Sequence, residues 1–456
     1  MNATMHAVDQ DEYRIAFVLS SPNRILTLRG RSPVRLPRVN IAKWARPAEQ
    51  ITNAIKQEWN LPSIVIDFLA GQDHLPQCVV VQVPESHSAE IQQQFLAVDI
   101  DSVDHADMTA VENRTMRNIL AGKSDNRGPF SRLGWVDEAK EWIKSSVPGH
   151  GVQFSDEVRQ LNASAAFALV RFGTRRGAAY WLKATGPPNE KEFTITAALS
   201  KYFPQYLPPL VAAREDWNAW ITEEAGKPIG DSCSLSKLES AVVSLAELQI
   251  ESIGYTQDLL AAGCVDQRCT VLKAQTDAVI RFLEDAMELQ TSVKVPRLGQ
   301  HRLREIGKII DDAYARMREL GVPDTLIHND LSLGNILYDG SKCVFADWAE
   351  AYIGNPFLTF QQLLQRVSRE KCGSGWGSQL KTIYKQRWTT VLGVRTVDCA
   401  LALAPLLAVA SYLYGRGTWL ASSRRDDPEL QSYARSLARH MDKAAQEPQL
   451  LEALCR

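Results

Sequence analysis

The residues best suited to chemistry lie together in one stretch late in the chain, residues 326–356. Within it the pair Asp339-Gly340 separates two short apolar runs. An Asp-Gly pair between apolar runs is typical of a tight antiparallel hairpin. Asn335 comes just before the first strand of this hairpin and Asp347 just after the second. We therefore expect their side chains to emerge at the same open end, about one strand spacing apart.

Two oxygen-bearing side chains at that separation suit a hard divalent cation, which keeps its waters and takes its other ligands from phosphates. Asp330 lies five residues before Asn335, on the loop that leads into the hairpin. A carboxylate beside a metal-bound phosphate can accept a proton from an attacking hydroxyl or orient it. His328 follows an apolar pair, and we expect it to pack and hydrogen-bond so that it holds the loop. The stretch is therefore predicted to carry out phosphoryl transfer. The competing interpretation is a loop whose polar residues only cap and turn.

The same stretch also resembles a known family. The tripeptide His-Asn-Asp that ends at Asp330, followed by Asn335 and then by Asp347-Trp348, resembles the catalytic segment of aminoglycoside phosphotransferases and choline-kinase-like small-molecule kinases. Those enzymes usually have His-Gly-Asp and Asp-Trp there, whereas protein kinases have His-Arg-Asp and Asp-Phe-Gly. The resemblance implies that Asp330 is the catalytic base and that Asn335 and Asp347 hold Mg²⁺. It also implies ATP as the donor and a two-lobed, protein-kinase-like fold over about residues 130–456.

A kinase needs an upstream lysine for the nucleotide phosphates and a glutamate that orients it. Lys183 ends a predicted strand, and Glu192 begins a predicted helix nine residues later. In the family this Lys and Glu form an ion pair, so we assign the pair to Lys183 and Glu192, with Glu190 as the competing choice. The alternative is a surface lysine beside a helix-start glutamate that is favoured by the helix dipole.

Two further nucleotide contacts are expected from position alone. No Gly-rich sequence precedes Lys183, so the groups that cradle the phosphates are left unassigned, with Ser164 as a candidate through its hydroxyl or its backbone N–H. Residues 220–226 lie where the family places the hinge that binds adenine through backbone groups, and residues 222–224 are chosen within it by position alone. This position assigns Glu223 to the nucleotide site.

The acceptor is expected to contact the helical part of the chain. From Ala351 onward there are fourteen Lys and Arg against eight Asp and Glu. Aminoglycosides are polycations that favour an acidic cleft, so this excess argues for a neutral or anionic acceptor. Glu350 and the tryptophans Trp376, Trp388 and Trp419 could line a pocket, although Trp at helical spacing is more often part of a core.

The elements that position these residues form an α+β chain. Short β-branched runs with two helices fill residues 1–122, and a polar linker with Gly and Pro covers residues 123–133. Residues 134–226 have the pattern of a small β-rich lobe. Residues 227–456 are helical almost throughout, interrupted by one strand-like stretch, and form a large helical lobe.

The first 122 residues loosely resemble the Nudix fold, with a strand pair, a helix over residues 48–59 and further strands. A Nudix box needs several carboxylates on one helix face to bind Mg²⁺, and of these only Glu58 is present. We therefore expect a separate, non-catalytic docking or regulatory domain, through which a protein partner could bind. A Nudix-type hydrolase that depends on Glu58 is the alternative.

The composition of the chain limits the classes of protein to which it can belong. The chain has 456 residues, 45% hydrophobic and 23% charged, and a formal net charge of −2, so neither disorder nor nucleic-acid binding is expected. Its eight cysteines are dispersed, and we expect them to be reduced in a cytoplasmic protein. No secretory signal is recognisable at the start. The apolar run of residues 399–414 is predicted to be a buried core helix, not a membrane span.

The sequence therefore predicts an ATP- and Mg²⁺-dependent kinase that phosphorylates a hydroxyl group of a small molecule. The alternative is a nucleotide-binding pseudokinase whose N-terminal domain docks a partner. Neither nucleic acid nor membrane is expected as a partner.

Overall fold

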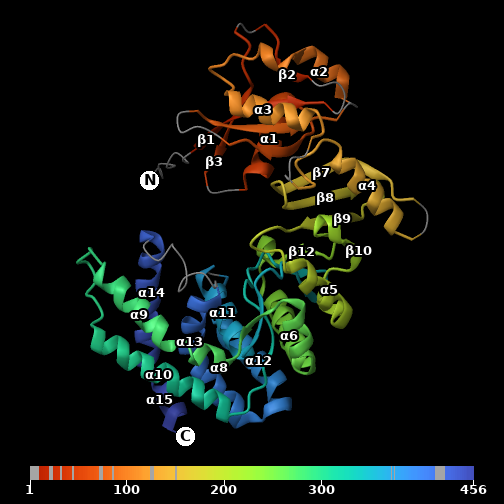
Figure 1. Cartoon of the computed structure of the whole chain (residues 1–456). Helices are drawn as coiled ribbons and strands as arrows, with labels where there is room; N and C mark the ends of the chain where they lie inside the picture. The colour runs from red at the N-terminus through yellow and green to blue at the C-terminus, as the bar shows by residue number, and fades with distance from the viewer. Residues whose placement is uncertain are drawn as a thin grey trace, which may run out of the picture. The chain divides into compact units, whose positions relative to one another are not determined.

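The structure, a computed structural model, divides the chain into two units (Figure 1). The first unit contains residues 1–193 and 209–224, and the second contains residues 194–208 and 225–456. The structure describes residues 10–19, 24–30, 33–43, 46–70, 75–84, 87–123, 128–148, 151–370, 372–373, 375–415 and 427–455.

The first unit begins with a six-stranded sheet in the order β4-β5-β1-β2-β6, in which β3 also pairs with β1. Strands β1 and β5 run parallel, and the other pairs are antiparallel. The strands are β1 (Gln10–Val18), β2 (Ile25–Leu28), β3 (Arg38–Ala42), β4 (Ile64–Phe68), β5 (Gln77–Gln82) and β6 (Phe95–Val98). The accompanying helices are α1 (Pro47–Trp59), α2 (Ser88–Gln94) and α3 (Ala110–Leu120).

Helices cover both faces of this sheet. Ile15 and Phe17 of β1 pack in a cluster with Ile51 of α1. Ala16 and Val18, which point to the opposite face because side chains alternate along a strand, pack in a second cluster that includes residues of α3. All four β1 residues are fully buried. The uninterrupted apolar run in β1 is therefore a consequence of a sheet that is covered on both sides.

A second sheet of the first unit is antiparallel, in the order β10-β11-β9-β8-β7. Its strands are β7 (Phe154–Ala163), β8 (Ala168–Thr174), β9 (Ala179–Ala184), β10 (Leu210–Arg214) and β11 (Ala219–Glu223). Helix α4 (Trp135–Ser146) precedes it, and α5 (Glu192–Tyr202) follows β9. This is the β-rich small lobe that the sequence predicts.

The two sheets share one buried core. The cluster under α3 continues to Trp135 of α4 and to Val170 of β8. Across the same boundary the side-chain amide of Gln160 donates to the Val65 carbonyl (2.9 Å), and its oxygen accepts from the Val65 N–H (2.8 Å). Phe130, inside the predicted linker, is only 2% exposed because it packs between the rings of Trp135 and Trp217. The described part of residues 1–122, expected to form a separate domain, thus shares a core with the second sheet.

The second unit is mostly helical. Helix α5 belongs to this unit from Thr194 onward, and its Ile195 and Leu199 pack in the unit's core. The other helices are α6 (Leu235–Glu251), α7 (Thr256–Ala262), α8 (Cys269–Lys273), α9 (Thr276–Glu288), α10 (Gln300–Glu319), α11 (Pro356–Arg369), α12 (Trp376–Leu392), α13 (Val394–Gly415), α14 (Pro428–Ala445) and α15 (Pro448–Cys455). One three-stranded sheet consists of β12 (Lys227–Pro228), β15 (Ile336–Tyr338) and β16 (Cys343–Phe345). The other consists of β13 (Val265–Gln267), β17 (Ala351–Gly354) and β14 (Thr325–His328). The predicted α+β class, with a small β-rich lobe followed by a large helical lobe, is confirmed.

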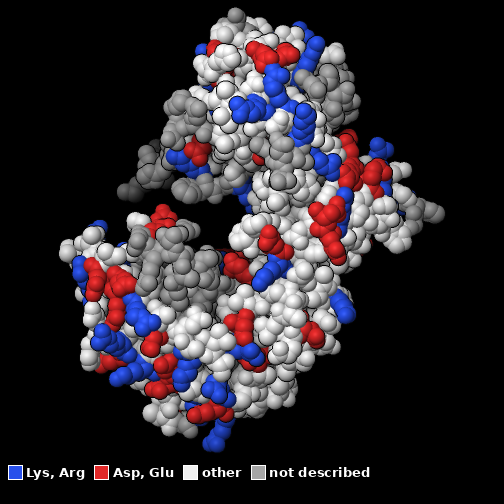
Figure 2. Space-filling view, viewed as in Figure 1, with Lys and Arg blue, Asp and Glu red and all other residues white. Residues whose placement is uncertain are grey.

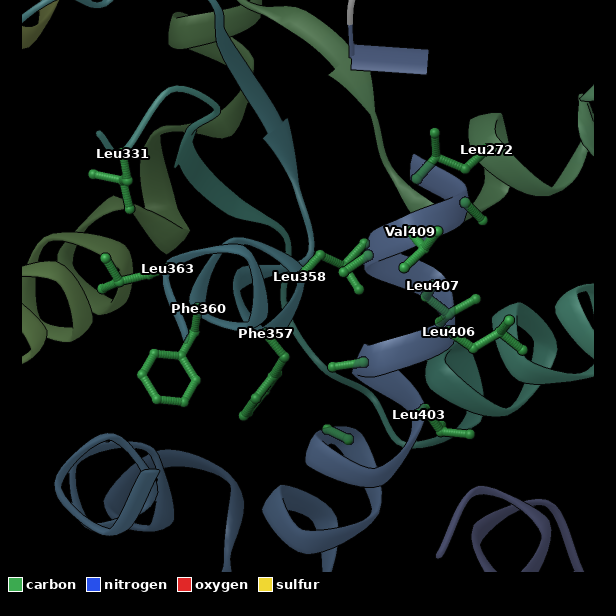
Figure 3. Packing of buried hydrophobic residues seen from close by; sticks show 14 of the residues in the cluster. Leu272, Leu331, Phe357, Leu358, Phe360, Leu363, Leu403, Leu406, Leu407 and Val409 are labelled. Carbon is green, nitrogen blue, oxygen red and sulfur yellow. The ribbon is translucent and has the colours of Figure 1, made fainter. Parts of the chain in front are cut away.

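Helix α13 is at the centre of this unit. By length and composition alone its Val394–Leu413 stretch could cross a membrane, but 67% of that stretch is buried within the protein. Figure 3 shows its Leu403, Leu406 and Leu407 among apolar side chains of neighbouring helices, including Phe357 of α11. We conclude that α13 packs as a core helix.

On the surface of the same unit, acidic and basic side chains are interspersed over the face seen in Figure 2.

One partly buried carboxyl group is expected to make the stability of the second unit depend on pH. Desolvation by burial raises the pKa of Asp324, just before β14, to about 6. A carboxyl pKa raised by folding costs stability as pH rises from about 4 through 6, because the folded state must then hold a buried charge. We expect Asp324→Asn to raise the free energy of unfolding by about 1 to 2 kcal/mol at pH 8, allowing for partial solvent screening. The gain should disappear at about pH 4.

Urea denaturation of both proteins at these two pH values measures this difference. Asp266→Asn is the matched control with the opposite sign, since the hydrogen bond from Arg268 lowers the pKa of Asp266. That variant is expected to be less stable than the parent at pH 8. Equal effects of Asp324→Asn at both pH values would contradict the assignment.

Candidate active site

Strand β14 places His328 at the entrance of the catalytic loop. All four residues of β14 are buried, and the strand pairs antiparallel with β17. His328 Nε2 lies 2.8 Å from the carbonyl oxygen of Ala346, and the imidazole centroid is 4.5 Å from the ring of Trp348. The imidazole therefore links the start of the loop to the residues on either side of Asp347. These contacts agree with the expectation that His328 packs and hydrogen-bonds to hold the loop.

The predicted hairpin is present. Strands β15 and β16 pair antiparallel, with Ile336 opposite Phe345. Asp339 Oδ1 accepts hydrogen bonds from the backbone N–H groups of Ser341 (2.8 Å) and Lys342 (2.9 Å). These bonds close the turn and hold the pKa of Asp339 below its usual range. The Asp-Gly turn thus sets the register that carries the two ends of the hairpin.

Asp330 and Asn335 are in direct contact. The Asn335 side-chain amide donates to the backbone carbonyl of Asp330 (2.9 Å) and to its carboxylate Oδ2 (3.2 Å). With Nδ2 turned toward Asp330, the amide oxygen is the atom of Asn335 that remains for a cation. The Asn335 backbone carbonyl accepts from the N–H of Ala346 (2.9 Å), so Asn335 stands beside the residue that precedes Asp347.

Asp347 has an unusual backbone conformation. Its φ of 69° lies in the left-handed region, which residues other than glycine seldom adopt and Asp tolerates better than most. The turn exposes its side chain just beyond the end of β16. In the described part of the chain, no group of three His, Cys, Asp or Glu side chains could hold a metal ion. Asn335 and Asp347 together offer two oxygen ligands, a set that fits Mg²⁺ when phosphate oxygens and waters complete its shell.

Helix α11 adds a residue that sequence reasoning missed. Arg366 Nη2 lies 3.4 Å from Asp330 Oδ1, so the guanidinium faces the predicted base. Beside it, the Asn329 amide donates to Glu350 Oε2 (2.9 Å). No local signal could have identified Arg366, because it lies 36 residues after Asp330 and reaches it only through the packing of α11.

Lys183 and Glu192, the residues predicted to contact and orient the nucleotide phosphates, form an ion pair in the first unit. Lys183 Nζ is 2.5 Å from Glu192 Oε1, and the Glu192 side chain is only 1% exposed. Glu190 is exposed, and its backbone carbonyl accepts from the Asn218 amide. Lys183 Nζ also lies 5.8 Å from the ring centroid of Trp220. Of the two glutamates that the sequence left open, the structure pairs Glu192 with Lys183.

Ser164 and Glu223 are less free to bind a nucleotide than expected. The Ser164 hydroxyl accepts from the Phe167 N–H (3.1 Å), and its own N–H donates to the Phe167 carbonyl (2.9 Å), so both groups close the turn between β7 and β8. The N–H of Glu223 donates to the carbonyl of Pro209 (2.9 Å). The backbone donors assumed for phosphate and adenine contacts are therefore already occupied within the second sheet.

The tryptophans considered as pocket lining have other roles where the structure describes them. Trp388 is fully buried, and its ring lies 5.5 Å from that of Phe357 in the core of the second unit. Trp376 packs against the same core. Trp419 lies outside the described residues.

Comparison with known proteins supports the family resemblance. Residues 265–380 match the model of the phosphotransferase enzyme family. This stretch contains Asp330, Asn335, Asp347 and Arg366, so the resemblance is confirmed for the segment that carries the predicted chemistry. The match does not reach residues 1–122, and the Nudix-like fold stays a prediction. No curated protein sequence matches the chain.

Similar solved structures are small-molecule kinases and phosphotransferases. Ethanolamine kinase from Plasmodium vivax is 14% identical, with a TM-score of 0.43, over 65% of this chain and 84% of that protein. Choline kinase from Cryptosporidium parvum is 12% identical, with a TM-score of 0.45, over 68% and 95%. Macrolide 2′-phosphotransferase from Brachybacterium faecium is 14% identical, with a TM-score of 0.40, over 65% and 97%.

Proposed function

We propose that this protein transfers the γ-phosphoryl group of ATP, with Mg²⁺, to a hydroxyl group of a small molecule. The observation that carries the proposal is the contact of Asn335 with Asp330 beside the hairpin that ends at Asp347. This contact supports a role for the Asp330 carboxylate in taking a proton close to a cation that Asn335, and Asp347 two residues after β16, would hold. The family match over residues 265–380 supports the same reaction class.

The proposed reaction uses Asp330 as the base. The acceptor hydroxyl oxygen attacks the γ-phosphorus and forms a new P–O bond, while the bond to the oxygen that bridges the β- and γ-phosphates breaks and ADP leaves. The hydroxyl proton passes to Asp330 Oδ1 or Oδ2. Asn335 and Asp347 would hold Mg²⁺, which offsets the charge of the phosphates when bound.

The phosphate-binding cation in this proposal is Lys183. The ammonium group of Lys183 would pair with phosphate oxygens of the nucleotide, and Glu192 would hold that ammonium group in place. The side chain of Glu192 is buried, which fixes its position and makes it an orienting residue.

The test is to identify a product. Purified protein is incubated with γ-labelled ATP, Mg²⁺ and a fractionated metabolite extract, and labelled compounds are identified by mass spectrometry. We expect a labelled small molecule that forms only when Mg²⁺ is present. Tight ATP binding with no labelled compound in any fraction would contradict the proposal and favour a nucleotide-binding pseudokinase.

A further inference from the structure

A pocket in the second unit opens beside the predicted base. Asn329 and Leu331, the neighbours of Asp330 in the chain, form part of its wall. Arg366 and Arg369 of α11 form another part, one helical turn apart on the same face of the helix. An acceptor bound in this pocket would therefore lie next to Asp330.

The two charged side chains that line this pocket are both basic. They are Arg366 and Arg369 of α11, with the imidazole of His440 of α14 beside them, and within the described part of the chain no Asp or Glu lines the pocket. Arg366 already faces Asp330, at 3.4 Å. Arg369 is exposed and forms no ion pair with any described residue. Arg369 thus remains available for a ligand.

The nearest carboxylates do not reverse this balance. Glu350, beside the catalytic loop, accepts a hydrogen bond from the Asn329 amide (2.9 Å), and Asp330 is paired with Arg366. A cationic amine in the pocket would face two guanidinium groups in a setting less polar than water, where repulsion is stronger than in bulk solvent. A carboxylate or phosphate would instead find planar donors that can bind two of its oxygens at once.

The remaining wall suits a carbon skeleton. The rings of Tyr412 and Tyr433 meet edge to face with centroids 5.9 Å apart, and both line the pocket with apolar residues of α13. A compound held by Arg369 at its charged end could lie along these rings and present a hydroxyl group to Asp330.

From these observations we propose that the phosphate acceptor is an anionic hydroxyl compound, whose carboxylate or phosphate group binds Arg369 and Arg366. This inference rests on the proposed kinase function and adds the substrate class. It excludes amino sugars and amino alcohols as the preferred acceptors. Binding should weaken with ionic strength, because the contacting arginines are partly exposed to solvent.

The test compares matched acceptors that differ only in charge. Two series are used: glycerol, glycerate and glycerol 3-phosphate, and glucose, gluconate and glucose 6-phosphate. Choline and ethanolamine serve as cationic compounds. Transfer from ATP and calorimetric binding are measured separately for the intact protein. We expect an anionic member of at least one series to bind, and to react with a kcat/KM at least tenfold above its neutral parent. The carboxylate and phosphate members show which anion is favoured.

The decisive comparison is between the parent protein and its Arg369→Gln variant. We expect it to raise the KM and Kd for the anionic compound at least tenfold while kcat changes less than threefold. Arg395→Gln is the matched control, an exposed arginine at the start of α13 that does not line the pocket. It should leave both constants unchanged.

The two proposals fail in different ways. Binding of anions that is lost in Arg369→Gln, without any phosphoryl transfer, would uphold the anion pocket and contradict the kinase. Transfer to neutral or cationic acceptors at equal or better rates would uphold the kinase and overturn the anionic acceptor. Absence of anion binding in both series, or an Arg369→Gln variant that binds as the parent does, would also overturn it.

Discussion

Asp330→Asn is expected to lower kcat for phosphoryl transfer by roughly 10²- to 10⁴-fold, the usual contribution of a general base. The affinity for ATP should stay within about twofold, because this base acts on the acceptor and not on the nucleotide. Asparagine has nearly the same shape and keeps an oxygen that can accept from Asn335, so the fold should be unaffected. Steady-state kinetics together with nucleotide titration measure both effects.

A matched control lies nine residues later, at the turn of the hairpin that follows Asp330. Asp339→Asn makes the same chemical change at an exposed turn, where the carboxylate accepts backbone hydrogen bonds. It should weaken the turn slightly and leave kcat near that of the parent. If Asp330→Asn kept more than a tenth of the parental kcat, Asp330 would not be the base.

Lys183→Met is expected to reduce both stability and transfer. The change removes the ammonium partner of a buried carboxylate, and breaking a buried pair in this way costs about 3 to 5 kcal/mol. Transfer should also fall at least a hundredfold, because the nucleotide phosphates lose a cation that offsets developing charge. Thermal denaturation and kinetics are recorded on the same preparations.

The double variant Lys183→Met with Glu192→Leu separates the two effects. Replacing both charged side chains with apolar ones should recover most of the lost stability, because the double variant no longer contains the unpaired buried carboxylate of Glu192 that the single variant leaves. Transfer should remain as low as in the single variant. If activity returned with stability, Lys183 would have a structural role only.

Local signals were sufficient for the hairpin. The Asp339-Gly340 turn signal and the short apolar runs around it predicted it, because a short turn fixes the register of the two strands that it joins. The helix expected from about residue 191 corresponds to α5, which begins at Glu192. In each case the residues that decide the conformation lie within a few positions of one another.

Very short strands, and contacts between residues far apart in the sequence, were not predictable. Strand β13 has three residues and β6 has four, too few for an alternation to stand out. The contact of Arg366 with Asp330 depends on how α11 packs, which no spacing reveals. The occupied N–H groups of Ser164 and Glu223 likewise follow from strand pairing and not from residue type.

The common core of the two sheets changes what trimming the chain would do. Without residues 1–122, the apolar sides of Trp135 and Phe130 would lose the cover that α3 and the first sheet give them, and Gln160 would lose Val65. An exposed apolar surface of this kind promotes aggregation. A fragment that begins at residue 123 would therefore be destabilised. Loss of activity in such a fragment would not be evidence that residues 1–122 have a regulatory role.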